Sequence, residues 1–214
     1  MANGATTLAE QFDSLEQQHE ASTLGLWTFL ATEIMFFGGL FTAYTVYRHA
    51  YPHSFAVGGN LNNLLLGSIN TGVLLTSSLT MALAVRAGQL GRAKAQMRFL
   101  LITIFFGLAF LGIKGFEYAE HFQEHLFPGP AFNPKLANHT QLFFVFYFAM
   151  TGLHAIHVIV GVGLLAVIAL MVRHRPFTSS YYTPIEMTGL YWHFVDIVWV
   201  FLYPLMYLIN RHIS

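Results

Sequence analysis

The sequence predicts an all-α integral membrane protein, a bundle of five transmembrane helices. Of its 214 residues, 55% are hydrophobic and only 9% are charged, whereas roughly 25% of the residues in a soluble domain are charged. Five apolar segments approach or exceed the ~20 residues that a helix needs to cross a bilayer. None of them alternates in polarity as the strands of a membrane barrel do, so we expect helices.

The first 23 residues are expected to form a polar, partly helical tail. They contain four acidic residues and no Lys or Arg, which is the opposite of the basic start of a signal peptide. Residues 24–214 are expected to form one transmembrane domain, because no repeat or low-complexity linker interrupts the apolar segments. The predicted spanning helices cover residues 24–47, 63–85, 97–115, 142–172 and 189–209.

The residues between these segments support each predicted helix in turn. Aromatic side chains suited to the membrane interface, such as Trp27 and Tyr51, lie near the two ends of the first helix. A basic loop separates the second helix from the third, and an acidic stretch follows the third. The sequence PGPAFNP at residues 128–134 breaks the chain before the fourth helix, because Pro and Gly favour turns. A second basic loop precedes the fifth.

The distribution of Lys and Arg predicts how the chain lies in the membrane. Cytoplasmic loops of membrane proteins carry an excess of these residues. The loops after the second and fourth helices hold most of them: Arg86, Arg92, Lys94, Arg98, Arg173 and Arg175. We therefore expect the N-terminus in the cytoplasm and the C-terminus outside.

Composition also excludes several classes of function. Ten basic residues balance ten acidic ones, so the chain lacks the basic surface of a nucleic-acid-binding protein. It has no cysteine, which rules out disulfides, thiolate zinc sites and iron–sulfur clusters. A metal ion would need His, Asp or Glu as ligands.

Five ionisable residues inside the predicted helices are candidates for function, because a charge in the bilayer is costly. They are Glu33, His154, His157, His193 and Asp196. A rise of about 1.5 Å per residue places all five in the cytoplasmic half of the membrane. One interpretation is a hydrogen-bonded cluster that holds or relays protons. The other is a set of polar contacts that fix the packing of the helices.

Two histidine patterns raise the question of a metal site. His154 and His157 lie three residues apart on one helix face, but a bis-histidine haem needs its ligands on opposite faces of the ring. A di-iron site would need Glu-x-x-His pairs on facing helices, and no spanning segment has one. His121, Glu124 and His125 match the H-x-x-E-H pattern of a zinc protease. A solvated extension of the third helix explains the same residues, so we expect no metal in this chain.

Several other residues are candidates for contact with lipid or with another protein subunit. Arg86, Arg92 and Arg98 suit lipid phosphates or a partner subunit. Trp192 is a candidate for the same role. Lys114 is expected to reach outward to the membrane surface as an anchor, and to pair with Glu117 three residues further on.

Five stretches of the chain, read in order, resemble the cytochrome c oxidase subunit III family, the third subunit of the haem-copper oxidases. They are ATEIMFFGGLFTAY around Glu33, INTGVLLTSS from Ile69, KGFEYAEHF from Lys114, TGLHAIHVIVG from Thr151 and YWHFVDIVWVFLYPLMYLI from Tyr191. The resemblance extends from Leu24 to Ile209.

This resemblance implies a subunit with no redox centre of its own, whose partner subunits I and II hold the haem and copper. It implies a place in a respiratory oxidoreductase and proton translocase, which reduces oxygen to water with electrons from cytochrome c. Subunit III of this family supports assembly, proton uptake and the retention of structural phospholipid. Glu33 matches the membrane carboxylate of the family that carbodiimides modify. The expected location is the bacterial inner membrane, which the chain would cross several times.

Alternatives remain open at this point. The longer form of the family has seven helices, whereas a five-helix form is similar to bacterial oxidases, including quinol oxidases, and to an accessory subunit of nitric oxide reductases. A different class of protein, a small proton-coupled transporter, would use Glu33 and Asp196 as its carboxylates. The transporter would function alone, whereas the oxidase subunit is expected to purify with haem-bearing partners.

Overall fold

The computed structural model describes residues 11–136, 139–174 and 182–208, which are helical apart from short connections. The elements are α1 (Leu15–Ala50), α2 (Pro52–Leu61), α3 (Leu64–Gln89), α4 (Ala93–Gln123), α5 (Thr140–His174), α6 (Thr183–Tyr203) and the π-helical segment η1 (Pro204–Leu208). The prediction of five spanning helices is confirmed, because α1, α3, α4, α5 and α6 with η1 are each long and apolar enough to cross a membrane.

Several helices extend beyond their predicted limits. α1 begins at Leu15, inside the expected polar tail, because the Ser14 hydroxyl caps its first turn by accepting a hydrogen bond from the Gln17 amide at 3.1 Å. α4 continues to Gln123 instead of ending near residue 115. Charged residues such as Glu and Lys are good helix formers, so an apolar run marks only part of a helix. The first ten residues, Arg175 and residues 209–214 lie outside the described part of the chain.

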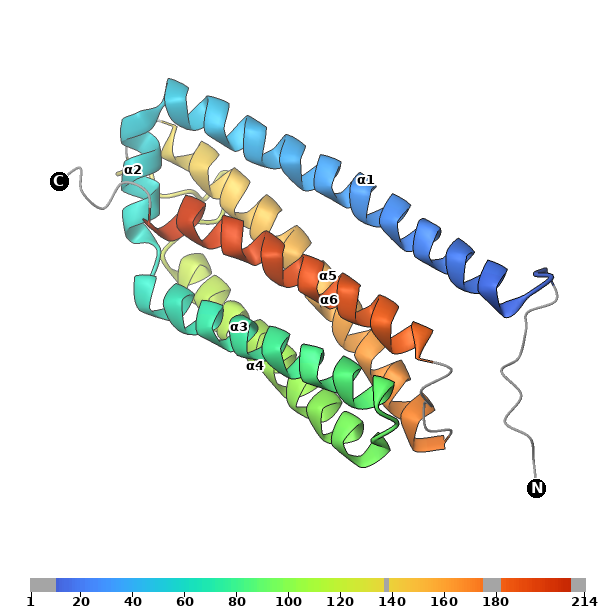
Figure 1. Cartoon of the computed structure of the whole chain (residues 1–214). Helices are drawn as coiled ribbons and strands as arrows, with labels where there is room; N and C mark the ends of the chain where they lie inside the picture. Colours follow the sequence, from blue (N-terminus) through green and yellow to red (C-terminus); the bar gives the residue numbers. More distant parts are fainter. Residues whose placement is uncertain (1–10, 137–138, 175–181, 209–214) are drawn as a thin grey trace.

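The short helix α2 was not predicted from the sequence. Pro52 occupies its first turn. Amide groups in the first turn make no hydrogen bond within the helix, so a proline, which has no amide hydrogen, is tolerated there. Its Phe55 side chain is fully buried, with ring centroids 5.3 Å from Tyr44 of α1 and 5.7 Å from Phe143 of α5. α2 therefore closes one end of the bundle, called here the α2 end, where α1 ends and α3 begins (Figure 1).

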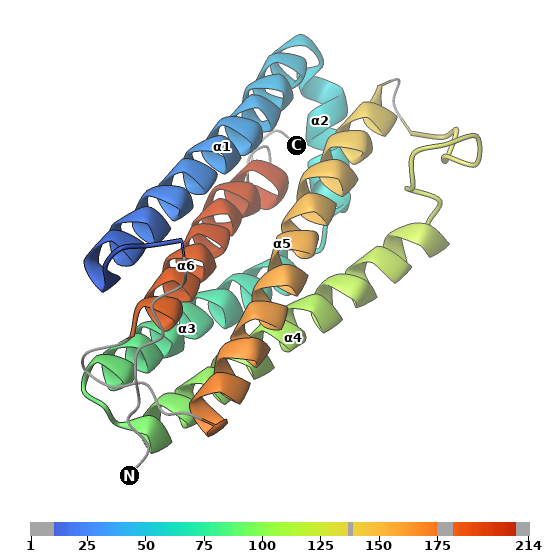
Figure 2. The same cartoon turned by 90° about the vertical axis from the view of Figure 1, so that its right-hand side faces the viewer.

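Four of the spanning helices form a closed core, and the fifth lies beside it. α3 packs against α4, α4 against α5, α5 against α6, and α6 against α3. α1 runs alongside α5 and α6 and contacts the core mainly through them (Figures 1 and 2). Residues that meet between helices can therefore lie either in the four-helix core or in the seam between that core and α1.

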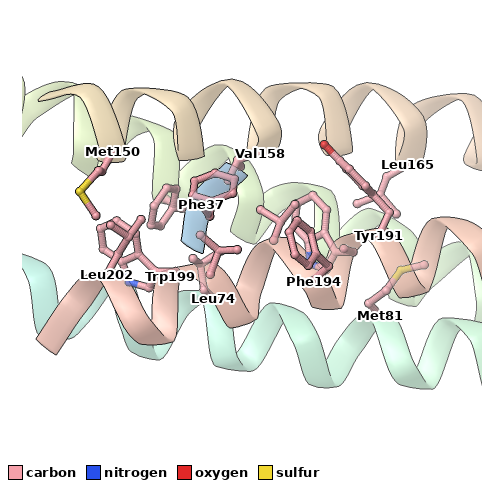
Figure 3. Close-up of a cluster of buried hydrophobic side chains, with 14 of the residues drawn as sticks. Phe37, Leu74, Met81, Met150, Val158, Leu165, Tyr191, Phe194, Trp199 and Leu202 are labelled. Atoms are coloured by element: carbon pink, nitrogen blue, oxygen red, sulfur yellow. The ribbon is translucent and has the colours of Figure 1, made fainter. Parts of the chain in front are cut away.

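Large apolar and aromatic side chains fill the interior, and Figure 3 shows part of this cluster between the helices. The indole of Trp192 fits against two glycines, since a Cβ added at either Gly107 or Gly161 would lie 2.8 Å from it. Large apolar residues also cover the outer faces: Met35 is 78% exposed and Leu65 is 68% exposed. Such an apolar exterior suits lipid, because it would be an aggregation hazard in water.

Candidate functional site: polar clusters in the helical bundle

Glu33 of α1 and His157 of α5 form a pair in the seam between α1 and the core. Glu33 Oε2 lies 3.2 Å from His157 Nε2, and the two side chains are 19% and 16% exposed. His157 Nδ1 lies 2.8 Å from the carbonyl oxygen of Leu153. A carbonyl oxygen can only accept, so Nδ1 carries a hydrogen, and Nε2 carries one only if the ring is an imidazolium. The pair therefore brings a carboxyl group against Nε2, the ring nitrogen that the Leu153 carbonyl leaves free.

A groove of about 470 Å³ opens beside this pair, lined by residues of α1, α5 and α6 that include Glu33, His157 and Tyr191. The Tyr191 hydroxyl donates a hydrogen bond to the His157 backbone carbonyl at 3.1 Å, which ties α6 to α5 at this level. The ring of Phe37 covers His157 from the α1 side, with centroids 5.3 Å apart. The Glu33–His157 pair is thus reachable from one side and enclosed by aromatic rings on others.

His193 and Asp196 lie on another side of the bundle, between α6 and α3. His193 Nδ1 lies 2.7 Å from the hydroxyl of Ser78 on α3. Asp196 is 4% exposed, and its carboxylate lies beside the same Ser78 hydroxyl. No hydrogen bond or ion pair within the described part of the chain joins either residue to Glu33 or His157.

His154 lies in the centre of the four-helix core. It is fully buried, and its ring centroid is 5.4 Å from that of Phe110 on α4 and 5.1 Å from that of Trp199 on α6. Three residues turn a helix by about 300°, so His154 and His157 point roughly 60° apart. That difference is enough to send His154 into the core and His157 toward α1. The five residues predicted at one depth therefore occupy three separate places, and only Glu33 and His157 are in direct contact.

Four polar residues form a cluster inside the core near the α2 end, which sequence reasoning missed. The cluster is called here the buried tetrad and consists of Lys114, Glu117, Tyr147 and Tyr207. Lys114 Nζ lies 3.0 Å from Glu117 Oε2, and these side chains are 3% and 0% exposed. The ammonium group also donates to the hydroxyls of Tyr147 at 2.9 Å and Tyr207 at 2.6 Å. Both hydroxyls in turn donate to Glu117 Oε1. All three ammonium hydrogens are used.

The prediction for Lys114 was therefore half right. Its pairing with Glu117 is confirmed, but the side chain points into the core and does not reach the membrane surface. The signal that could have shown this is the spacing of residues along α4. Lys114 and Glu117 lie on the same helix face as four other buried residues: Leu100, Thr103, Gly107 and Phe110. Aromatic residues in apolar runs gave no hint that two hydroxyls would converge there.

The segment η1 brings Tyr207 to the tetrad and is held from two further sides. The Tyr44 hydroxyl of α1 donates to the Leu205 carbonyl at 2.7 Å. The Asn62 amide nitrogen, just after α2, donates to the Met206 carbonyl at 3.0 Å. Helix ends leave carbonyl groups without helical partners, and these two side chains supply partners here. η1 thus ties α1, α2, α4 and α5 together at the α2 end.

The H-x-x-E-H pattern does not assemble into a zinc-binding helix face. His121 lies in α4 but is only 2% exposed, with its ring centroid 5.1 Å from that of Tyr147. The solvated position expected for it was therefore wrong. α4 ends at Gln123, Glu124 is its C-cap, and His125 has a left-handed backbone with φ of 56°. Within the described residues, no three His, Asp or Glu side chains are placed to hold a metal ion.

The candidates for outside contact divide into two groups. Arg86, Arg92 and Arg98 are exposed around the turn between α3 and α4, where Arg86 contacts the Gln89 side chain at 3.5 Å. Their contact with lipid or another subunit stays a prediction. Trp192, expected in the same role, is instead 1% exposed, and its indole donates to the Ser77 hydroxyl at 3.0 Å. Its indole therefore packs inside the bundle.

Comparison with known proteins identifies the family. A family model described as cytochrome c oxidase subunit III matches residues 14–211. The chain belongs to this family. The match includes α1 with Glu33, the α4 and α5 members of the buried tetrad, and all of α6. Subunit III chains are components of haem-copper oxidase complexes, so this membrane protein has other oxidase subunits as partners.

Two relatives of this subunit III chain show similarity over nearly its whole length. The probable quinol oxidase subunit 3 of Staphylococcus aureus (strain USA300) is 29% identical over 198 residues, which cover 92% of this chain and 94% of that protein. The probable quinol oxidase subunit 3 of Staphylococcus epidermidis is 29% identical over 202 residues, covering 94% of this chain and 96% of that protein. The sequence-based assignment to the subunit III family is confirmed.

Proposed function

We propose that this chain is the non-redox third subunit of a proton-pumping haem-copper terminal oxidase, which reduces oxygen to water in the bacterial inner membrane. Subunits I and II hold the haem and copper and perform the electron transfer. This chain stabilises the complex, retains structural phospholipid and supports proton uptake. The family match over residues 14–211 supports the assignment to an oxidase. The chain itself has no cysteine, which agrees with a subunit that carries no thiolate-bound metal.

The Glu33–His157 pair is the observation that carries the proposed role in proton uptake. The 3.2 Å contact places an acid beside a base that can exchange a proton with it, while the Leu153 carbonyl accepts from the other ring nitrogen of His157. The groove beside the pair gives that proton a way in and out. An ionisable pair at membrane depth is costly to retain, and such residues commonly mark proton pathways.

The variant Glu33→Gln tests this role. It removes the acid but keeps the shape of the side chain, so we expect a normal haem spectrum together with slower proton uptake or faster loss of activity during turnover. Glu20→Gln, an exposed carboxylate of the same helix, is the matched control and should behave as the wild type. Altered haem content in Glu33→Gln, or wild-type turnover in both variants, would contradict the proposal.

A chemical measurement addresses the same carboxyl group. Hydrophobic carbodiimides react with protonated carboxyl groups, so Glu33 is expected to be labelled, with less labelling as the pH rises. Mass spectrometry of the labelled chain locates the modified residue. The absence of label on Glu33, or labelling that does not change with pH, would argue against a titrating pair.

The electron donor is the finer part of the proposal. Cytochrome c is the first candidate, in line with the description of the family. Quinol is the second, because the two relatives are named as probable quinol oxidase subunits. Oxygen uptake by the purified native complex, supplied with reduced cytochrome c or with a quinol, distinguishes them. A chain that purified alone and moved protons without haem-bearing partners would instead be the transporter.

Lipid contact and orientation complete the proposal. The exposed Arg86, Arg92 and Arg98 form a basic cluster at the end of the bundle opposite α2, and such a cluster suits both the cytoplasmic side and anionic headgroups. Replacing all three with Gln should reduce the phospholipid that remains with the purified complex, measured by lipid mass spectrometry. Unchanged lipid content would refute that contact.

A further inference from the structure

The centre of the four-helix core contains buried polar atoms that have no partner in the described part of the chain. His154 is fully buried, and neither of its ring nitrogens has a hydrogen-bond partner. Its ring packs edge-on to Phe110, with centroids 5.4 Å apart, and lies 5.1 Å from the ring of Trp199. A neutral imidazole offers one donor and one acceptor, and both are unused here.

Asn70 of α3 reaches the same level of the core. It is fully buried, and its amide nitrogen donates to the Phe110 carbonyl over 3.4 Å, while its oxygen Oδ1 has no partner among the described residues. The Trp199 indole donates to the neighbouring Thr71 hydroxyl at 3.1 Å, which aligns α6 with α3 at this point. Helices α3, α4, α5 and α6 therefore bring Asn70, Phe110, His154 and Trp199 together.

The two ring nitrogens of His154 and Oδ1 of Asn70 make three unpartnered buried atoms on two helices of the core, among the residues that the structure describes. Buried polar atoms in folded proteins are almost always bonded to protein or to ordered water. Such a concentration in one place needs a ligand.

Water fits the chemistry of these atoms. A water molecule donates two hydrogen bonds and accepts two, so water can serve the Oδ1 acceptor of Asn70 and both nitrogens of His154. A metal ion does not fit, since no three His, Asp or Glu side chains in the described ranges are placed to hold one. Lys114, a neighbouring cation, already uses its three hydrogens in the tetrad.

We propose that ordered water molecules occupy the core between α3, α4 and α5, bonded to His154 and Asn70. This core water site goes beyond the proposed function, because it requires neither a particular electron donor nor a role for Glu33. It makes the interior of the subunit III bundle locally wet at a depth where an apolar core would be expected. Ionisable residues within membrane bundles commonly face such water-filled cavities.

A density map of the native oxidase complex in lipid, at a resolution that shows bound water, tests the proposal directly. We expect ordered density about 3 Å from a ring nitrogen of His154 and from Oδ1 of Asn70. A map without such density overturns the proposal. So does a map in which His154 and Asn70 bond directly to each other or to a neighbouring subunit.

Thermal unfolding of the purified complex supplies an independent measurement. If the site is wet, His154→Leu loses the bound water and lowers the unfolding midpoint, whereas His154→Gln keeps a donor and an acceptor and stays closer to the wild type. If the site is dry, His154→Leu removes two unsatisfied nitrogens and leaves the midpoint unchanged or higher, which overturns the proposal. Met150→Leu, one turn away on α5 and fully buried, is the control for leucine at this depth.

Discussion

Replacement of Lys114 or Glu117 tests the energetic importance of the buried tetrad. Breaking a buried ion pair by removing one partner costs about 3–5 kcal/mol, because the other charge stays buried without compensation. Glu117→Gln leaves the ammonium without a counter-charge and turns an NH2 group either to the ammonium or to the two tyrosine hydroxyls, all of which need an acceptor. We expect a loss near the top of that range, about 4–5 kcal/mol, or roughly 10³-fold in the folding equilibrium constant.

Lys114→Met should cost less, about 3 kcal/mol, because the Glu117 carboxylate keeps its two hydroxyl donors. The double variant Lys114→Met/Glu117→Gln leaves no buried charge in the tetrad. Its loss of stability should therefore fall at least 2 kcal/mol or so below the sum of the two single losses. This non-additivity separates a coupled ion pair from two side chains that merely pack well.

The free energy of unfolding is measured for each variant by titrating SDS into lipid–detergent micelles and following helix content by circular dichroism. Glu120→Gln is the matched control, since this half-buried carboxylate lies three residues further along α4, and we expect a change within about 0.5 kcal/mol. Single variants within about 1 kcal/mol of the wild type, or a double variant whose loss equals the sum of the singles, would refute the reasoning.

Two further predictions use the same titration. Gly161→Ala places a Cβ 2.8 Å from the Trp192 ring and should cost about 1–3 kcal/mol through overpacking, whereas Gly163→Ala meets no atom within 4 Å and should be neutral or slightly stabilising. Equal effects of these two alanines would show that the close approach is unimportant. Tyr44→Phe removes the 2.7 Å hydrogen bond to the Leu205 carbonyl and should cost about 1 kcal/mol; wild-type stability would mean that η1 does not depend on this contact.

Sequence reasoning grouped the polar residues by their depth in the membrane but could not tell which of them meet. Counting residues along the helices put Glu33 and His157 at one depth, and the structure places their side chains 3.2 Å apart. The same count grouped them with His154, which packs against Phe110 in the core, and with His193 and Asp196, which lie beside Ser78 of α3. Depth in the membrane follows from position along a helix, whereas contact also depends on the direction in which the side chain points.

For the buried tetrad, sequence reasoning found the right pair but placed it wrongly. Lys114 and Glu117 were recognised as a pair three residues apart, but a lysine near the end of an apolar run was expected to reach water. The structure supplies Tyr147 from α5 and Tyr207 from η1, which satisfy both charges in the interior. Tyrosines scattered through apolar segments are ordinary in membrane helices, so nothing in the local sequence distinguished these two.

The sequence by itself determined that this protein is helical and membrane-spanning, that it crosses the membrane five times, and that it belongs with subunit III of the oxidases. Those properties depend on hydrophobicity summed along the chain and on the order of short motifs, which are local quantities. Only the tertiary structure decided which polar residues meet, where Trp192 packs, and that Lys114 is buried. The rotation of each helix about its axis is set by packing against its neighbours, and no single helix carries that information.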